Sequence, residues 1–351
     1  METGEGVCLF FFTGGGTGMK KEEGNGVDEF LGRLYETIKP EFRIEDCFNG
    51  ERNFPSWKEE LSNEVKRILA VDDEAEWKIL EKVPLFPYGS VILSYQWYSI
   101  FGLECPCLVL EPEDVKGAVI SFSGHGKGIM NILGGEGMDT YMHDFPLELA
   151  RRGFVIYCPE LLGIGSLRLS DDIKENRPSS CERLSSVLLA SGKTLLGMRV
   201  MQGRAVMRMI ERLQPGLKIS LMGISGGGTV VSFLSPIESG NLSSVVISGY
   251  AGCWEDSILA MRHCSCNYVP GMLESFTLPT LLSSVAPVPM LWETGKKDRI
   301  FPQKSALRAE KTVREAYQRW GKEEDFVVDA FPGGHEIHGK DAYDFLLSHM
   351  K

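Results

Sequence analysis

Hydrophobic positions in the first third of the chain follow a helical spacing and then a strand pattern. Residues 27–38 and 56–69 carry apolar stripes of amphipathic helices, and Ser56 with Glu59 has the spacing of a capping box. Residues 78–110 are rich in β-branched and aromatic residues, which is typical of strands. This part of the chain predicts scaffold helices followed by antiparallel strands at one edge of a sheet.

From residue 118 onward, short apolar runs alternate with helical segments. The expected strands are 118–122, 154–158, 219–222, 244–248, 289–293 and 325–330, and the expected helices are 138–152, 196–213, 229–234, 305–320 and 341–349. Strands that alternate with helices build a mostly parallel sheet with helices on both faces. The sequence therefore predicts an α/β fold with antiparallel strands added at the N-terminal edge.

The pattern indicates one domain over residues 27–351, because no internal repeat or low-complexity linker interrupts it. Its N-terminal helices occupy residues 27–75. Two segments break the alternation: residues 159–193, expected to form a lid-like insertion, and residues 249–273. Such excursions at the ends of parallel strands commonly build binding sites. Residues 1–26 are expected to be a flexible leader, because their glycine-rich run fits neither phosphate-loop template.

A serine lies between a predicted strand and a predicted helix, in the pattern Gly-x-Ser-x-Gly. The strand 219–222 leads into Gly223, Ser225 and Gly227, and an apolar segment follows. Strand, tight turn and helix form the context of a nucleophile elbow, in which the serine hydroxyl is exposed at the edge of the sheet. The five residues alone are equally compatible with a glycine-rich turn that holds an incidental serine.

A nucleophilic serine needs a base and an acid that orients the base, and in this context both follow the serine in the chain. His335 lies in a glycine-rich loop directly after the last predicted strand. Asp298 follows the preceding strand through a glycine-containing turn. The rivals are His338 in the same loop and Asp329 inside the last strand. We expect Ser225, Asp298 and His335 to form a catalytic triad.

An oxyanion hole needs two backbone N–H groups. Gly226, which directly follows the serine, is expected to supply one of them. Lys127 is expected to supply the other from the glycine-rich loop 123–128, which follows an early strand. His125 lies in the same loop but precedes Ser225 in the chain. We expect His125 to brace this loop and to border the substrate pocket.

The segment 249–273 follows the strand next to the one that carries the serine, so it is expected to wall the acyl pocket. Its bulky residues include Tyr250 and Trp254, which we assign to the pocket lining.

Cys264 and Cys266 form a compact trio with His263, but they lack the spacer common in structural zinc sites. We expect these two thiols to pack as small buried hydrophobes. No metal and no cofactor are expected.

Charge and cysteine content limit the partners and the compartment. The net charge of −11 argues against nucleic acid or an anionic membrane as the main partner. No stretch approaches the length of a membrane span, and the apolar run 7–12 is too short for a signal peptide. The nine cysteines are therefore expected to be reduced thiols in a cytoplasmic protein.

With these residues placed, the chain resembles the α/β-hydrolase superfamily, and most closely its acetyl xylan esterase and dienelactone hydrolase-like serine esterases. The matching stretches are 124–126, 223–228, 263–268, 293–302 and 331–335, in the family's order. The resemblance covers roughly residues 85–350 and implies the α/β-hydrolase fold and the same triad. One departure is expected to loosen a buried link: Gln202 and Gly203 stand where relatives often have an aspartate before Arg-Ala.

The resemblance and the residues together predict a serine esterase, a carboxylic ester hydrolase that acts through an acyl-enzyme on Ser225. Its partner is expected to be a small-molecule acetyl ester, another short acyl ester or a lactone. Three alternatives remain open: a prolyl-oligopeptidase-like peptidase, an acyltransferase or lactone-forming enzyme on the same triad, and a non-catalytic binding protein on a hydrolase fold.

Overall fold

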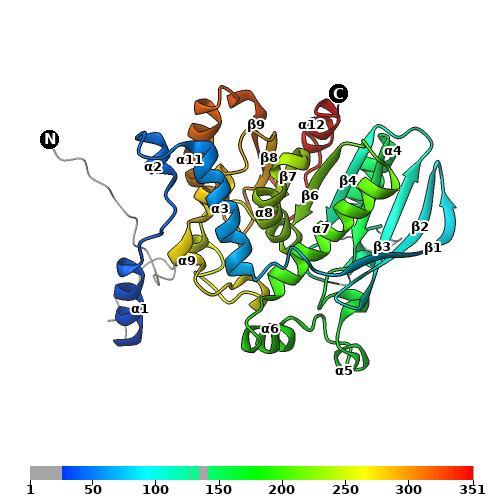
Figure 1. The fold of residues 1–351 in the computed structure, drawn as a ribbon, viewed down its shortest axis with the longest axis horizontal. Helices are drawn as coiled ribbons and strands as arrows, with labels where there is room; N and C mark the ends of the chain where they lie inside the picture. Colours follow the sequence, from blue (N-terminus) through cyan, green and yellow to red (C-terminus); the bar gives the residue numbers. More distant parts are fainter. Residues whose placement is uncertain (1–25, 127, 134–140, 351) are drawn as a thin grey trace.

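The computed structural model describes residues 26–126, 128–133 and 141–350, and Figure 1 shows their arrangement. Within these residues, nine strands form a single sheet in the order β1-β2-β3-β5-β4-β6-β7-β8-β9. The strands are β1 (Trp77–Tyr88), β2 (Val91–Ile100), β3 (Leu103–Pro112), β4 (Gly117–Phe122), β5 (Phe154–Pro159), β6 (Ile219–Ile224), β7 (Leu242–Ser248), β8 (Met290–Gly295) and β9 (Phe326–Phe331).

The direction of the strands agrees with the predicted class of fold. β1, β2, β3 and β5 pair antiparallel with one another in that order. From β5 through β4, β6, β7 and β8 to β9, every neighbouring pair is parallel. The mostly parallel sheet with antiparallel strands at its N-terminal edge is therefore confirmed.

Helices cover both faces of the sheet. They are α1 (Gly26–Thr37), α2 (Ile44–Phe48), α3 (Phe54–Leu69), α4 (Phe145–Arg151), α5 (Ser170–Lys174), α6 (Cys181–Ala190), α7 (Leu195–Leu213), α8 (Gly226–Glu238), α9 (Met272–Ser275), α10 (Leu278–Ser283), α11 (Gln303–Arg319) and α12 (Ala342–Ser348). One core joins α3, α7, α8, α10 and α11 to one face of the sheet, and a second core joins α4 and α12 to the other. Figure 1 shows α3, α7 and α8 side by side on the first face.

The two cores follow from the strand period of two. In β4, Ala118 and Ile120 belong to the first core and Val119 to the second, because successive side chains point to opposite faces. All six residues of β4 are buried, as they are in β5 and β6. Continuous apolar strands are typical of parallel strands that are covered on both faces.

The order of the strands determines where a site can form. The chain passes from β4 to β5 on one side, and β6 lies on the other side of β4. Connections that leave in opposite directions open a crevice at the carboxyl ends of the strands, where open α/β sheets bind their ligands. The loops after β4 and β6, which carry His125 and Ser225, both begin at this point.

Some local expectations differ from the structure or lie outside it. Asn53, not Ser56, caps α3: the Asn53 side chain accepts a hydrogen bond from the Ser56 N–H, and the helix begins at Phe54. The segment 159–193, expected to form a lid-like insertion, contains the helices α5 and α6.

Residues 1–25 of the expected leader lie outside the described residues, and so do residues 138–140 of the expected helix 138–152. In the described part of that helix, residues 141–144 form turns and α4 begins at Phe145. Among the described helices, none is long and apolar enough to cross a membrane.

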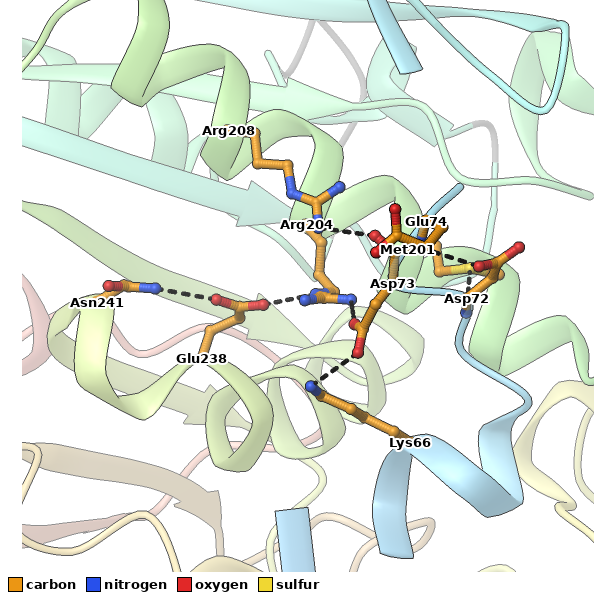
Figure 2. A network of polar contacts seen from close by, with 9 residues as sticks. All are labelled: Lys66, Asp72, Asp73, Glu74, Met201, Arg204, Arg208, Glu238 and Asn241. Atoms are coloured by element: carbon orange, nitrogen blue, oxygen red, sulfur yellow. Dashed lines mark hydrogen bonds and ion pairs between the residues drawn. The ribbon is translucent and has the colours of Figure 1, made fainter. Parts of the chain in front are cut away.

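A polar network ties the chain segment after α3 to α7 and α8, on the helical layer shown in Figure 2. The guanidinium of Arg204 in α7 lies between the carboxylates of Asp73 and Glu238. Lys66 in α3 reaches the other oxygen of Asp73 at 3.2 Å, and Asn241 donates to Glu238 at 3.1 Å. Arg204 is the centre of this network because it joins both acids and is itself largely buried.

We expect Arg204→Ala to lower the free energy of unfolding by about 1–3 kcal/mol, because it leaves Glu238 without its charged donor and Asp73 with Lys66 alone. Lys66→Ala is the matched control on the same acid, and its exposed pair should contribute less than about 1 kcal/mol. Urea unfolding of the two variants and the unaltered chain measures both values. Equal losses in the two variants would contradict the central position of Arg204.

Candidate active site

Ser225 lies on a strained turn between β6 and α8. Its backbone has φ 55° and ψ −119°, a conformation that is costly for a residue with a side chain and that persists only where its surroundings enforce it. The Ser225 N–H donates to the Ser248 carbonyl at the end of β7, and the Ser225 carbonyl accepts from the Thr229 N–H. Ser225 is half-buried whereas Ile224 and Gly226 on either side are buried, so the turn presents the serine.

The glycines around the serine are required by close contacts of the backbone. A Cβ on Gly223 would lie 2.5 Å from the carbonyl oxygen of Gly227, and a Cβ on Gly227 would lie 2.1 Å from the carbonyl oxygen of Phe122. Neither backbone oxygen can move aside without displacing a strand or a helix. The Gly-x-Ser-x-Gly pattern therefore has a structural cause, which favours the nucleophile elbow over an incidental serine.

The buried Asp298 and the half-buried His335 form a pair at the carboxyl edge of the sheet. The Nδ1 atom of His335 lies 2.8 Å from one carboxylate oxygen of Asp298. The other oxygen of Asp298 accepts the N–H groups of Ile300 and Phe301 at 2.8 and 2.9 Å. These two backbone bonds fix the carboxylate, so that its remaining oxygen can orient the imidazole.

The two rival residues form a separate pair with each other. His338 Nδ1 lies 2.5 Å from a carboxylate oxygen of Asp329. His335 lies instead between the rings of Tyr141 and Phe301, with centroid distances of 5.6 and 5.7 Å. The structure therefore joins the preferred acid to the preferred histidine and leaves the rivals together.

The Asp298–His335 pair lies against the end of the strand that neighbours the serine. Gly249 follows Ser248, whose carbonyl accepts the Ser225 N–H. A Cβ on Gly249 would lie 3.0 Å from the His335 ring and 3.6 Å from Asp298 Oδ2. A single turn of backbone thus contacts both the elbow and the acid–histidine pair.

A cavity of about 270 Å³ opens over the serine. Its lining consists of His125, Ser225, Gly226, Met261, Arg262, His263, Cys264, Asn267, Ile300 and Phe301. His125 therefore borders this cavity. Burial, together with the nearby His125 and His335, lowers the pKa of His263 from its usual value, which favours a neutral imidazole in the wall.

The assignment of Tyr250 and Trp254 to the pocket lining is wrong. Tyr250 is 1% exposed and Trp254 is 2% exposed, and both belong to the core. The Trp254 ring packs on Phe233 and Phe276, at centroid distances of 6.3 and 6.1 Å. Large aromatic rings gain more by burial against other rings than by lining a small cavity. The later part of the same segment, from Met261 to Asn267, contributes the lining instead.

Of the two expected oxyanion donors, Gly226 lies at the first position of α8 and Lys127 lies outside the described residues. The N-terminus of a helix of 13 residues carries a partial positive charge that attracts an anion. On the other side of Lys127, a Cβ on Gly128 would lie 1.9 Å from a carboxylate oxygen of Glu160. Glu160 also accepts the Ile129 N–H at 3.1 Å, and burial raises the pKa of this acid to about 7.

A group of sulfur and nitrogen ligands adjoins the cavity. The ligand atoms of His125, Cys181, Cys264 and Cys266 all lie within 4.8 Å of one another. Sequence reasoning identified Cys264 and Cys266 but joined them to His263, which is not a member of this group. Cys181 comes from the insertion and His125 from the loop after β4. No sequence spacing connects these three segments, so only the fold reveals the group.

The expected loosening of a buried link at Gln202 is not what the structure has. The Gln202 amide donates to the Glu160 carbonyl and accepts from the Leu162 N–H, both at 2.9 Å. An amide can serve a carbonyl and an N–H at once, which a carboxylate cannot. Gln202 therefore joins α7 to the start of the insertion that follows β5.

Comparison with solved structures identifies the fold. A proposed acetyl xylan esterase from Bacteroides fragilis superposes with a TM-score of 0.71 at 14% identity, over 87% of this chain and 82% of that one. A methylesterase superposes with a TM-score of 0.61 at 16% identity, over 84% of this chain and 64% of that one. A promiscuous CE15 esterase from a marine bacterial metagenome superposes with a TM-score of 0.61 at 11% identity, over 84% of this chain and 91% of that one. No protein-family model and no curated protein matches the sequence.

These neighbours are α/β-hydrolase esterases, as the resemblance in sequence predicted. At such low identities the likeness shows the fold, and this chain has the α/β-hydrolase fold.

We expect Trp254→Ala to destabilise the protein by about 3–5 kcal/mol, because it opens a cavity among packed aromatic rings. Met261→Ala is the control from the same segment: its side chain is 42% exposed, and the change should be within about 0.5 kcal/mol. Chemical unfolding of both variants tests the assignment of Trp254 to the core. A small loss for Trp254→Ala would return this residue to the pocket.

We expect Gly249→Ala to displace the His335 ring, because the added methyl group lies 3.0 Å from it. Gly192→Ala is the matched control: Gly192 also has a positive φ, of 70°, but no atom lies within 4 Å of its added Cβ. Both variants should lose about 1–3 kcal/mol of stability from backbone strain. The downfield proton resonance of the His335–Asp298 bond should shift or vanish in Gly249→Ala alone. Its persistence in both variants would place the ring away from this turn.

Proposed function

We propose that the protein is a serine esterase, a carboxylic ester hydrolase that forms an acyl-enzyme on Ser225. The observation that carries the proposal is the Asp298–His335 pair at the sheet edge that also presents the strained Ser225. A nucleophile, a base and an orienting acid are the groups that acyl transfer to serine requires. The esterase fold of the structural neighbours supports the same conclusion at the level of fold.

In the proposed mechanism, Ser225 Oγ attacks the acyl carbon and His335 accepts its proton. Because Asp298 holds Nδ1 of His335, the remaining nitrogen, Nε2, is the atom that serves as the base. The carboxylate keeps the imidazole in this tautomer and stabilises the imidazolium that forms. His335 then returns the proton to the leaving alcohol, and a water molecule that is activated in the same way releases the acid.

The developing oxyanion requires donors that are aimed at it before the reaction begins. We assign one donor to the Gly226 N–H, which begins α8. The second is assigned to the N–H of Lys127, by the order of the motif in the sequence. The Glu160 carboxylate, which accepts the Ile129 N–H, would hold the loop that carries this second donor.

The size of the cavity favours a short acyl group. Pockets for drug-sized ligands typically span about 300–1,000 Å³, and the cavity over Ser225 is about 270 Å³. An acetyl or similarly short acyl ester, or a small lactone, fits this space. Arg262 is the cationic side chain in the lining, and Met261 supplies apolar surface.

We also propose that the chain works in the cytoplasm, as one domain. Reduced thiols are the expected state there, and all eight cysteines among the described residues are free.

We expect Ser225→Ala to lower turnover of p-nitrophenyl acetate by about 10⁴-fold or more, because it removes the atom that forms the acyl-enzyme. The same variant should lose labelling by a fluorophosphonate probe while its circular dichroism spectrum is unchanged. His335→Ala should cause a loss of similar size. His338→Ala is the matched control, since it removes the other histidine of the loop and the other histidine–aspartate pair.

Two results would count against this proposal. Full turnover in Ser225→Ala would exclude the serine as the nucleophile, and a greater loss in His338→Ala than in His335→Ala would reverse the choice of base. Product analysis separates hydrolysis from acyl transfer, because transfer yields a new ester in the presence of an acceptor alcohol whereas hydrolysis yields the free acid.

A further inference from the structure

Four soft ligands from three distant segments meet beside the active-site cavity. His125 comes from the loop after β4, Cys181 begins α6, Cys264 directly precedes the 3₁₀ turn Ser265–Asn267, and Cys266 lies within that turn. His125 Nε2 lies 3.2 Å from Cys266 Sγ, and the sulfurs of Cys266 and Cys264 are 3.3 Å apart. One ligand atom of each residue lies within 4.8 Å of those of the other three.

These distances match the coordination sphere of one tetrahedral ion. With zinc–sulfur bonds of about 2.3 Å and a zinc–nitrogen bond of about 2.0–2.1 Å, tetrahedral ligands lie about 3.5–3.8 Å from one another. The separations of 3.2 and 3.3 Å are slightly shorter than this range and the remaining ones are at most 4.8 Å, so modest shifts of the side chains suffice to enclose an ion. An iron–sulfur cluster contains several irons and sulfides and needs more room between its thiolates. Three sulfurs and one imidazole nitrogen are also a ligand set that structural zinc sites use.

A buried cation lies beside the sulfurs. Arg199 in α7 is 1% exposed, and its guanidinium donates to Cys181 Sγ at 3.1 Å and to the Leu162 carbonyl. Among the described residues, no carboxylate lies within 4.0 Å of this guanidinium to form an ion pair. A buried charge needs a partner of opposite sign. Zinc with three thiolates and a neutral imidazole has a net charge of −1, which Arg199 balances.

We infer that His125, Cys181, Cys264 and Cys266 bind one zinc ion. Binding releases the protons of the three thiols to solvent, and His125 coordinates through Nε2 as the neutral imidazole. Four protein ligands fill the tetrahedron, so the ion is structural and leaves no position for a substrate. This inference replaces the expectation that the chain binds no metal and that the thiols of Cys264 and Cys266 are merely small hydrophobes.

The position of the ion gives it a role at the active site. The His125 ring packs on the elbow, since a Cβ on Gly226 would lie 2.7 Å from its Nδ1. The His125 carbonyl accepts the Tyr141 hydroxyl, whose ring stacks on His335. The zinc ion therefore joins the loop after β4 to the insertion and to the segment that lines the cavity. It acts through His125 as a clamp on the loop to which one oxyanion donor is assigned.

The full-length protein, purified with zinc in the growth medium and without chelator, should contain one equivalent of zinc by mass spectrometry of the metal content. After the metal is removed under reducing conditions, addition of Co²⁺ alone should give thiolate-to-cobalt charge-transfer bands and the intense visible bands of a tetrahedral site. Both readouts use the unaltered chain, so they depend neither on a variant that folds nor on esterase activity. A negative result for zinc would therefore leave the proposed esterase function untouched, and a lack of esterase activity would leave the zinc site untouched.

Cys181→Ser and Cys266→Ser should each lower bound zinc to below about a tenth of an equivalent, because the loss of a thiolate opens the closed tetrahedron. Cys47→Ser is the matched control: it removes a half-buried cysteine outside the group and should keep the full equivalent. The zinc-free protein should also melt at a lower temperature than the zinc-bound protein, and added zinc should raise its melting temperature back to that of the zinc-bound protein.

Three outcomes would overturn the inference. The first is a disulfide between any two of Cys181, Cys264 and Cys266, seen as protection from alkylation in protein isolated without reductant. The second is stoichiometric iron with sulfide in place of zinc. The third is the absence of both stoichiometric zinc and cobalt bands in a folded, reduced protein.

Discussion

The close approach of α8 to β4 and β6 is the constraint on which the active-site architecture depends. At Gly227 the backbone passes so near to the Phe122 carbonyl that no side chain fits. At Gly223, the carbonyl oxygen of Gly227 leaves no room for a side chain either. This packing forces the chain to reverse within one residue, and Ser225 takes the strained conformation that results. The strain is sustained because strand and helix are both buried and neither can move aside.

Two buried acids hold the loops on either side of this turn. Glu293 in β8 accepts the Ser248 hydroxyl and the Gly339 N–H, both at 2.6 Å, and so joins the end of β7 to the loop that carries His335. Glu160, after β5, accepts the Ile129 N–H and holds the loop after β4. Burial raises the pKa of both acids, so each has an elevated affinity for a proton. Through these hydrogen bonds to backbone N–H groups, the two acids hold the loops in place against the sheet.

Sequence predicted the features that have a local cause, and missed those that arise from contacts between distant segments. Hydrophobic period and length are enough to locate strands such as β4 and β6, because a buried parallel strand needs a continuous apolar run. Asp298 and His335 could be chosen because each follows a strand at the edge where Ser225 lies. Trp254 was misassigned because the same bulky side chain suits a pocket wall and a core, and only its packing on Phe233 and Phe276 distinguishes them. The group that contains Cys181 depends on three segments that are distant in the sequence and meet in space, which no spacing encodes.

Among the described residues, the carboxylate of Asp298 forms no ion pair with a lysine or arginine, so its charge is left for the proposed base. Asp298 receives two backbone N–H groups, and among the described residues His335 is its one ion-pair partner within 4.0 Å. A lysine or arginine on the same carboxylate would neutralise the charge that must stabilise the imidazolium. The buried cation of this region, Arg199, bonds instead to Cys181. If zinc occupies the sulfur site as inferred, its net charge and that of Arg199 cancel, so the clamp can hold the loop of His125 without adding a field that opposes protonation of His335.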